Sequence, residues 1–327
     1  MALRIGAVKE KTGYPLSCYT VQPNDKAQPS NMPSKNLISL ANIANLVTSV
    51  TKGLERKEIC IDGRNTNYLE AGSGETLLFI HGFGGTNHMW RSWLQQLKTR
   101  YRVIAVTIPE LEPTLNFSKA HYSFRTYSEW INEFIEKIGV TQCHPLAHST
   151  GACIAAFFAS SYPEKTSSAT LFSPPNIGQL PTNETVNTFD KAQNLDLTNP
   201  EQLKKLISDS FFATPTIPML LLNQLTKIID SRQKDINFML SQLSNASNVL
   251  LRRLTLINSP TLIIGGKSDL FLSNTETLQY LQHQINGSQL ELLENCGHFP
   301  FQEQTDISMA IFESFIAAIQ NRNLAAS

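Results

Sequence analysis

Short apolar runs that alternate with helical patterns constrain this chain more than any other feature. Residues 76–80 (TLLFI) and 101–107 are nearly continuous apolar runs, which is typical of strands buried on both faces of a parallel sheet. Further strands are expected at residues 143–148, 168–172, 261–265 and 289–293. Helical patterns separate most of these runs. The sequence therefore predicts an α/β fold with a mostly parallel central sheet covered by helices on both faces.

Local signals refine this fold prediction. Residues 57–62 and 65–70 flank Asp62-Gly63, a pair that favours a tight hairpin turn. Residues 126–137 have the apolar spacing of a helix, and we expect Thr126 to begin it in a capping box with Glu129. Pro145 lies inside a predicted central strand, where it has no N–H to donate, so we expect a bulge there.

The predicted strands fall into two groups, which suggests an inserted segment. Residues 176–253 are helical in pattern and contain no buried-strand run; helices are expected from Asn199-Pro200, at 218–229 and at 238–243. We therefore predict a helical cap at 176–253 inserted into a core formed by 54–175 and 254–327. Residues 1–53 are predicted to form an N-terminal extension with a helix at 36–50. That helix could pack on the domain or contact a membrane surface or partner.

Composition excludes several classes of protein. The 327 residues carry 27 basic and 27 acidic side chains, and this balance argues against a nucleic-acid binder. No apolar run reaches the 18 residues expected of a membrane-spanning helix. The five cysteines are scattered, with no C-x-x-C pair, which argues against a disulfide framework. Because the first residues also show no apolar leader, we expect a cytoplasmic protein.

Chemistry-bearing side chains follow the predicted strands. Ser149 follows the run 143–148, Asp269 follows 261–265, and His298 follows 289–293. Parallel sheets bind ligands outside the carboxyl ends of their strands, so we expect these three side chains to meet at one edge.

The motifs around these residues carry a family resemblance. They are HGFGG at 81–85, AHSTG at 147–151, GKSD at 266–269 and GHFPFQE at 297–303. From about residue 57 to its C-terminus the chain resembles the α/β-hydrolase fold family. Within that family it looks most like the capped esterases, monoacylglycerol lipases and carbon–carbon-bond hydrolases. The chain order of serine, acid and histidine is the order this family uses.

The resemblance implies a catalytic triad. Ser149 would be the nucleophile on a sharp strand-to-helix turn, and His298 would act as base and then as acid. Asp269 would orient His298, although it could instead be a turn residue that opens a helix. The segment LFSPPN at 171–176 offers no rival acid, because it is uncharged.

The resemblance also implies an oxyanion hole and its supports. The backbone N–H groups of Phe83 and Thr150 would form the hole. His81 is expected to shape the loop, and Glu303 to lie in a loop that supports His298. Cys296 is expected to be buried. The supporting residues are His81, Gly82, His148 and Gly151.

Some residues depart from the family pattern or exclude other sites. The loop 107–113 (TIPELEP) lacks the usual glycine-rich turn, so the pocket wall there should differ. Asn87 and Thr261 stand where a dinucleotide fingerprint and a phosphate loop need glycine. His144 and His148 lie on a strand without a carboxylate partner. We therefore expect no cofactor and no metal.

The sequence thus predicts a serine hydrolase of the carboxylesterase or lipase type. Its substrate would be a small-molecule ester with an apolar acyl or lipid-like group, cleaved through an acyl-enzyme. Three alternatives remain open: a carbon–carbon-bond hydrolase with the same triad, an acyltransferase with that triad, and a non-catalytic ligand-binding protein on this fold.

Overall fold

A computed structural model describes residues 53–109, 111, 122–178, 187–269 and 272–326. Its strands are β1 (Glu55–Ile61), β2 (Arg64–Ala71), β3 (Thr76–Ile80), β4 (Arg102–Val106), β5 (His144–His148), β6 (Ala169–Phe172), β7 (Thr261–Gly266) and β8 (Gln289–Leu293). They form one sheet in the order β1-β2-β4-β3-β5-β6-β7-β8. All pairs from β4 to β8 are parallel, whereas β2 runs antiparallel to β1 and to β4. The predicted mostly parallel sheet is confirmed.

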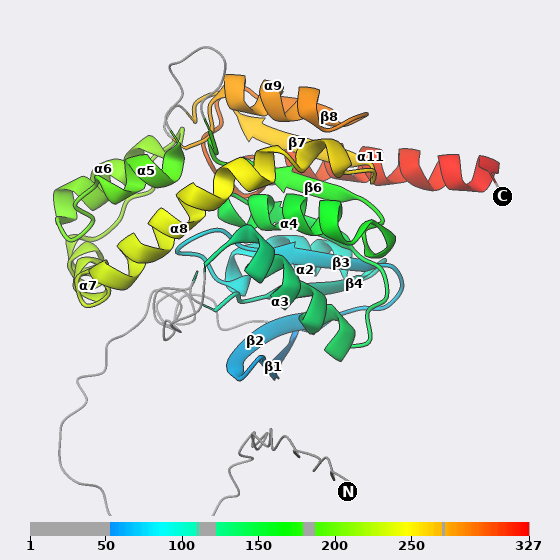
Figure 1. Cartoon of the computed structure of the whole chain (residues 1–327), viewed down its shortest axis with the longest axis horizontal. Helices are drawn as coiled ribbons and strands as arrows, with labels where there is room; N and C mark the ends of the chain where they lie inside the picture. Colours follow the sequence, from blue (N-terminus) through cyan, green and yellow to red (C-terminus); the bar gives the residue numbers. More distant parts are fainter. Residues whose placement is uncertain (1–52, 110, 112–121, 179–186, 270–271, 327) are drawn as a thin grey trace, which may run out of the picture. The chain divides into compact units, whose positions relative to one another are not determined.

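Helices cover both faces of the sheet (Figure 1). Leu77 and Phe79 of β3 belong to one apolar cluster, whereas Leu78 and Ile80 belong to the other, as the alternation of side chains along a strand requires. The first cluster includes residues of η1 (Asn87–Trp90), α2 (Arg91–Leu97), α10 (Pro300–Glu303) and α11 (Thr305–Ala326). The second includes residues of α3 (Phe124–Lys137), α4 (Thr150–Ser161) and α9 (Thr275–Gln284).

Two local predictions need correction. Helix α3 begins at Phe124 rather than Thr126, because Ser123 is its N-cap and the Ser123 side chain accepts a hydrogen bond from the Thr126 N–H. A capping box from Thr126 to Glu129 is therefore wrong. The hairpin turn is as expected, since Asp62 and Gly63 both have positive φ, at 49° and 71°.

The expected bulge at Pro145 is also displaced. Pro145 lies in uninterrupted register with β3. On the other side, a bridge joins Cys143 to Thr166 and the next pair joins Leu146 to Thr170. One more residue is therefore present on the chain that leads into β6 than on β5. The irregularity is therefore on the segment that leads into β6 and not on β5, which contains Pro145.

Between β6 and β7 the chain is helical. It contains α5 (Thr188–Gln193), α6 (Pro200–Asp209), α7 (Met219–Asp230) and α8 (Gln233–Leu251). Asn199 caps α6 as the Asn-Pro signal predicts. Helix α8 is much longer than the expected 238–243, and α5 was not expected. Two short 3-10 turns, η2 (Pro163–Lys165) and η3 (Leu254–Leu256), complete the described elements.

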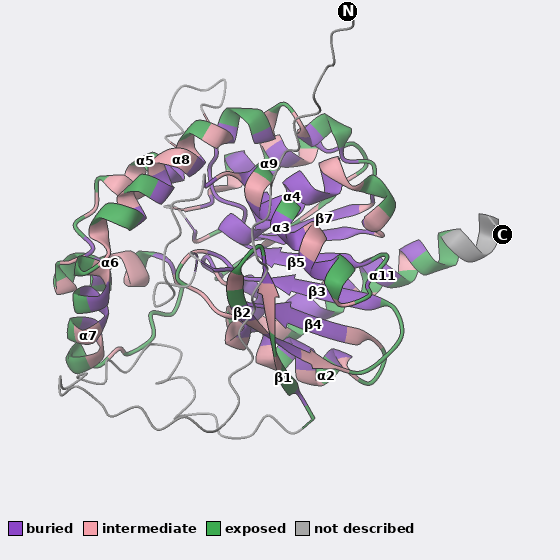
Figure 2. Ribbon diagram, turned by 60° about the horizontal axis from the view of Figure 1, so that its bottom comes forward, coloured by how far each residue is buried: buried purple, intermediate pink, exposed green. Residues whose placement is uncertain are grey.

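Helix α8 packs the helical segment between β6 and β7 against the helices that cover the sheet. It packs against α5 and reaches α3 and α4 (Figure 2). Its residues Ile236, Met239, Leu240, Leu243 and Leu250 belong to the same apolar cluster as α3 and α4. A separate small cluster, centred on Leu197, Leu203, Leu222 and Leu225, joins α6 and α7.

Two expectations concern membranes. The helix predicted at 36–50 lies outside the described residues. No helix in the described part of the chain is long and apolar enough to cross a bilayer.

Candidate active site

Ser149 occupies a strained turn between β5 and α4. Its backbone has φ 54° and ψ −125°, a conformation that non-glycine residues rarely adopt. The Ser149 N–H donates to Phe172 O at 2.9 Å, so the end of the neighbouring strand β6 holds this turn. The turn brings Ser149 to the carboxyl edge of the sheet, at the N-terminus of the 12-residue helix α4.

Two glycines bring the Ser149 turn close to the loop after β3. A Cβ on Gly82 would lie 2.8 Å from Ser149 Cβ, and a Cβ on Gly151 would lie 2.5 Å from His81 O. Both contacts are too short for a real side chain, so glycine is required. Within the described residues, no hydrogen bond uses the backbone N–H of Phe83 or Thr150. Both donors therefore remain available for a ligand oxygen.

His81 joins the loop after β3 to the residues that follow β4. Its Nδ1 donates to Gly82 O at 2.8 Å, and its Nε2 accepts the Ile108 N–H at 2.9 Å. Complete burial lowers the pKa of His81 to about 4, so the ring is neutral and one nitrogen can accept. These bonds suit the loop-shaping role expected of His81.

His298 and Asp269 meet behind the pocket. His298 Nδ1 lies 2.5 Å from Asp269 Oδ2, and both side chains are buried. The other oxygen of Asp269 accepts the Leu272 N–H at 3.0 Å. Asp269 therefore contacts His298 through one oxygen and closes a local turn through the other, whereas the N-cap of α9 is Asn274. In the part of the chain that is described, no hydrogen bond joins Ser149 Oγ to His298, although both residues line one pocket.

His148 packs beside this pair. Its Nε2 donates to the carbonyl oxygen of His298 at 2.9 Å, and the two rings are 4.7 Å apart. Burial, together with the neighbouring His298, holds the pKa of His148 well below its usual range. The sequence predicted His148 only as a supporting residue, and the structure adds its partner, the backbone carbonyl of His298.

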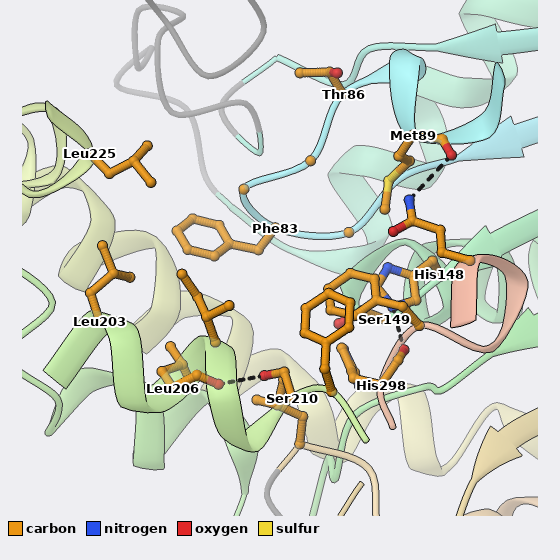
Figure 3. A pocket seen from close by; sticks show the side chains of 18 of the residues that line it. Phe83, Thr86, Met89, His148, Ser149, Leu203, Leu206, Ser210, Leu225 and His298 are labelled. Carbon is orange, nitrogen blue, oxygen red and sulfur yellow. Dashed lines mark hydrogen bonds between the residues drawn. The ribbon is translucent and has the colours of Figure 1, made fainter. Parts of the chain in front are cut away.

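The pocket itself is apolar and has a volume of about 620 Å³ (Figure 3). Gly82, Phe83, His148, Ser149 and His298 line one side of it. The opposite side comes from α6, α7 and the start of α8. Among the described residues its lining contains no Asp, Glu, Lys or Arg; its apolar members include Met89, Leu203, Leu206, Ile207, Phe211, Leu225, Ile228, Ile229, Ile236, Leu272 and Phe299.

The remaining sequence expectations lie close to the histidine. Glu303 lies on α10 and not in a loop as expected, and its Oε1 accepts the N–H groups of Gly297 and Phe299 at 3.0 and 3.1 Å. Cys296 is buried, and burial raises the pKa of its thiol to about 12. No cluster of three or more metal-ligating side chains occurs in the described ranges.

Comparison with protein families gives a match over most of the chain. A family model described as the alpha/beta hydrolase fold matches residues 75–305, more than two thirds of the sequence. The matched region contains the four motifs at 81–85, 147–151, 266–269 and 297–303.

Individual relatives include monoacylglycerol lipases and a hydrolase named for oxo-dioate substrates. Human monoacylglycerol lipase ABHD6 is 27% identical over 265 residues, covering 76% of this chain and 77% of the human protein. A 2-hydroxy-6-oxononadienedioate/2-hydroxy-6-oxononatrienedioate hydrolase of Klebsiella pneumoniae is 24% identical over 268 residues, covering 76% and 89%. Among solved structures, a bacterial membrane phospholipase A is 25% identical with a TM-score of 0.71, covering 86% of this chain and 92% of that one.

Proposed function

The chain belongs to the α/β-hydrolase fold family, and on this premise we propose that it is a serine hydrolase that cleaves a carboxylic ester. One observation carries the proposal: His298, joined to the buried Asp269 at 2.5 Å, borders the same pocket as Ser149 on its strained turn. A nucleophile, a base and an acid that orients the base are the groups that acyl transfer requires.

The proposed reaction proceeds through an acyl-enzyme. His298 Nε2 takes the proton of Ser149 Oγ as the oxygen attacks the ester carbonyl, and Asp269 stabilises the imidazolium that forms. The N–H groups of Phe83 and Thr150 stabilise the oxyanion, with the N-terminus of α4 adding its dipole. His298 then protonates the leaving alcohol. Water, activated by His298, releases the acid and restores Ser149.

The lining of the pocket supports an apolar acyl or lipid-like substrate. Aliphatic side chains from α6 and α7 line the pocket together with Ser149, and a chain buried among them gains free energy by leaving water. Leu203, Leu206 and Leu225 are members of this wall (Figure 3). We propose that residues 176–253 form a cap over a core of 54–175 and 254–327, and that the cap sets acyl-chain specificity.

The same lining argues against a substrate with a buried carboxylate. Such a group needs a cationic partner, and the described lining contains no Lys or Arg. The Klebsiella relative, by its name, acts on dioates. We therefore place carbon–carbon-bond cleavage second. Acyl transfer to an alcohol keeps the same triad and differs only in the acceptor that attacks the acyl-enzyme.

We further propose a cytoplasmic enzyme whose residues 36–50 either pack on the domain or contact a membrane surface. The thiols of Cys143, Cys153 and Cys296 are free and buried, which fits a reducing compartment. Deletion of residues 36–50 should weaken binding to liposomes while leaving hydrolysis of a water-soluble ester intact. Equal liposome binding by both proteins would contradict the membrane contact.

Hydrolysis of p-nitrophenyl esters, from acetate to palmitate, tests the proposed function. Wild type should turn over the esters. The acyl chain length that gives the highest turnover should report the length of acyl chain that the pocket accommodates. Ser149→Ala should lose at least about a thousandfold in kcat. Ser92→Ala, an exposed serine on α2, should match wild type. Retained turnover in Ser149→Ala would overturn the assignment of Ser149 as the nucleophile. Absent turnover together with no reaction with a fluorophosphonate would favour a ligand-binding protein.

A further inference from the structure

The backbone of His298 is held from two directions. Gly297 and His298 are buried, so their N–H groups need partners. Glu303 Oε1 accepts the N–H groups on either side of His298, from Gly297 and Phe299. The His298 N–H itself donates to Ser210 O at 2.7 Å, at the C-terminal end of α6 in the inserted helical segment.

Glu303 also reaches that segment directly. Its second oxygen, Oε2, accepts the Phe212 N–H at 2.8 Å. One carboxylate therefore joins the histidine loop to the residues that follow α6. The rings of Phe211 and Phe299 stack beside it, with centroids 4.5 Å apart and an interplanar angle of 13°.

The packing at Gly297 makes this junction tight. A Cβ there would lie 2.5 Å from Ser210 O and 2.8 Å from Phe211 Cα. Only glycine allows the two backbones to approach so closely. A displacement of residues 210–212 must therefore move the histidine loop or break its hydrogen bonds.

We propose that Glu303 is a positioning residue that couples the end of α6 to His298, so that the base is aligned only while residues 210–212 are docked. The proposal rests on the proposed function, because it assigns Glu303 an effect through the base of that reaction. Glu303 touches no reacting atom. A misplacement of about 1 Å in a catalytic group can cost about a hundredfold in rate, so loss of this anchor should act on kcat.

A graded pair of substitutions tests the coupling. Glu303→Gln keeps one acceptor oxygen and loses the other, whereas Glu303→Ala removes both. Glu294→Gln is the matched control, since it removes an exposed carboxylate four residues before His298 that pairs with Lys267. The readouts are kcat and KM for a p-nitrophenyl ester well below the melting temperature, and amide hydrogen exchange of segments 295–301 and 210–214.

The proposal expects a fall in kcat of roughly 10- to 100-fold in Glu303→Ala with KM changed by less than about threefold, and a smaller fall in Glu303→Gln. Exchange should accelerate in both segments in Glu303→Ala and stay at the wild-type rate in Glu294→Gln. Wild-type kcat with only a lower melting temperature would overturn the coupling. So would unchanged exchange at 210–214. If wild type hydrolyses no ester, the proposed function fails. The exchange measurement alone then tests whether Glu303 holds residues 210–212 to the histidine loop.

Discussion

At the scale of single residues, Gly151 determines how closely the nucleophile turn approaches the oxyanion loop. A Cβ at this position would meet His81 O at 2.5 Å and Ile80 O at 2.9 Å, and both are backbone atoms that cannot rotate away. Thr150 directly precedes Gly151, and Phe83 lies two residues after His81, so both proposed donors are next to this contact in sequence. A methyl group here must therefore move one of the two proposed donors.

Gly151→Ala should lower the free energy of unfolding by about 1–3 kcal/mol and reduce ester turnover at least tenfold. Gly178→Ala is the comparison, because its Cβ would meet only the Leu251 side chain, which can adjust. Urea unfolding and kcat for both variants check this. Equal activity in Gly151→Ala and wild type would argue against an oxyanion hole at this contact.

Buried histidines make the stability of the fold depend on pH. Burial lowers the pKa of His81 from 6.5 to about 4. Between these values the unfolded chain binds the proton and the folded chain does not. Stability is therefore full above pH 6.5 and falls as pH falls towards 4, by an amount on the order of 3 kcal/mol for this ring.

Unfolding free energies at pH about 7.5 and about 5 should differ less in His81→Gln than in wild type. The variant should be less stable at the higher pH, because its loop bonds are weakened. His283→Gln, an exposed histidine on α9, should keep the wild-type difference. A full wild-type difference in His81→Gln would refute the assignment of this pH dependence to His81.

At the scale of elements, the start of α3 is determined by one side chain. Ser123 Oγ accepts the Thr126 N–H at 3.1 Å. Ser123→Ala should cost about 1 kcal/mol in thermal or urea unfolding, whereas Ser123→Asp should retain most of the stability, since aspartate also caps helices. Equal stability of all three proteins would show that the cap contributes nothing.

Elements with strong local signals were predictable, and those that depend on distant contacts were not. The apolar runs predicted the parallel strands. The positions of Ser149, Asp269 and His298 after three of the predicted strands predicted that they lie at one edge of the sheet. Thr126 resembled a cap because Glu129 follows it by three residues, whereas the observed cap is Ser123, whose side chain accepts the Thr126 N–H. The contact of Ser210 O with the His298 N–H leaves no signal, because it uses backbone atoms 88 positions apart in sequence.

At the scale of the whole molecule, the helices between β6 and β7 differ in how extensively they pack against the core. Helix α8 shares the main apolar cluster, and Arg253 just beyond it donates to Ser160 O at 3.0 Å. Helices α6 and α7 pack mainly on each other in their own small cluster. The junction of residues 210–212 with the histidine loop links this pair of helices to the core by hydrogen bonds.

Hydrogen exchange should therefore be slower in α8 than in α6 and α7, because opening α8 disrupts the main core whereas opening the α6–α7 pair does not. Peptide-resolved exchange of the wild-type chain measures this. Equal protection across the three helices would mean that the segment opens as one unit with the core.

The central claim is that Ser149 is a nucleophile activated by His298 and Asp269, and labelling with a fluorophosphonate tests it most directly. Intact-mass and peptide analysis of the full-length protein should find one adduct, on the peptide that contains Ser149. Ser149→Ala should take up none, and His298→Ala should react far more slowly. An unlabelled wild-type protein that is folded, or an adduct on another residue, would contradict the claim.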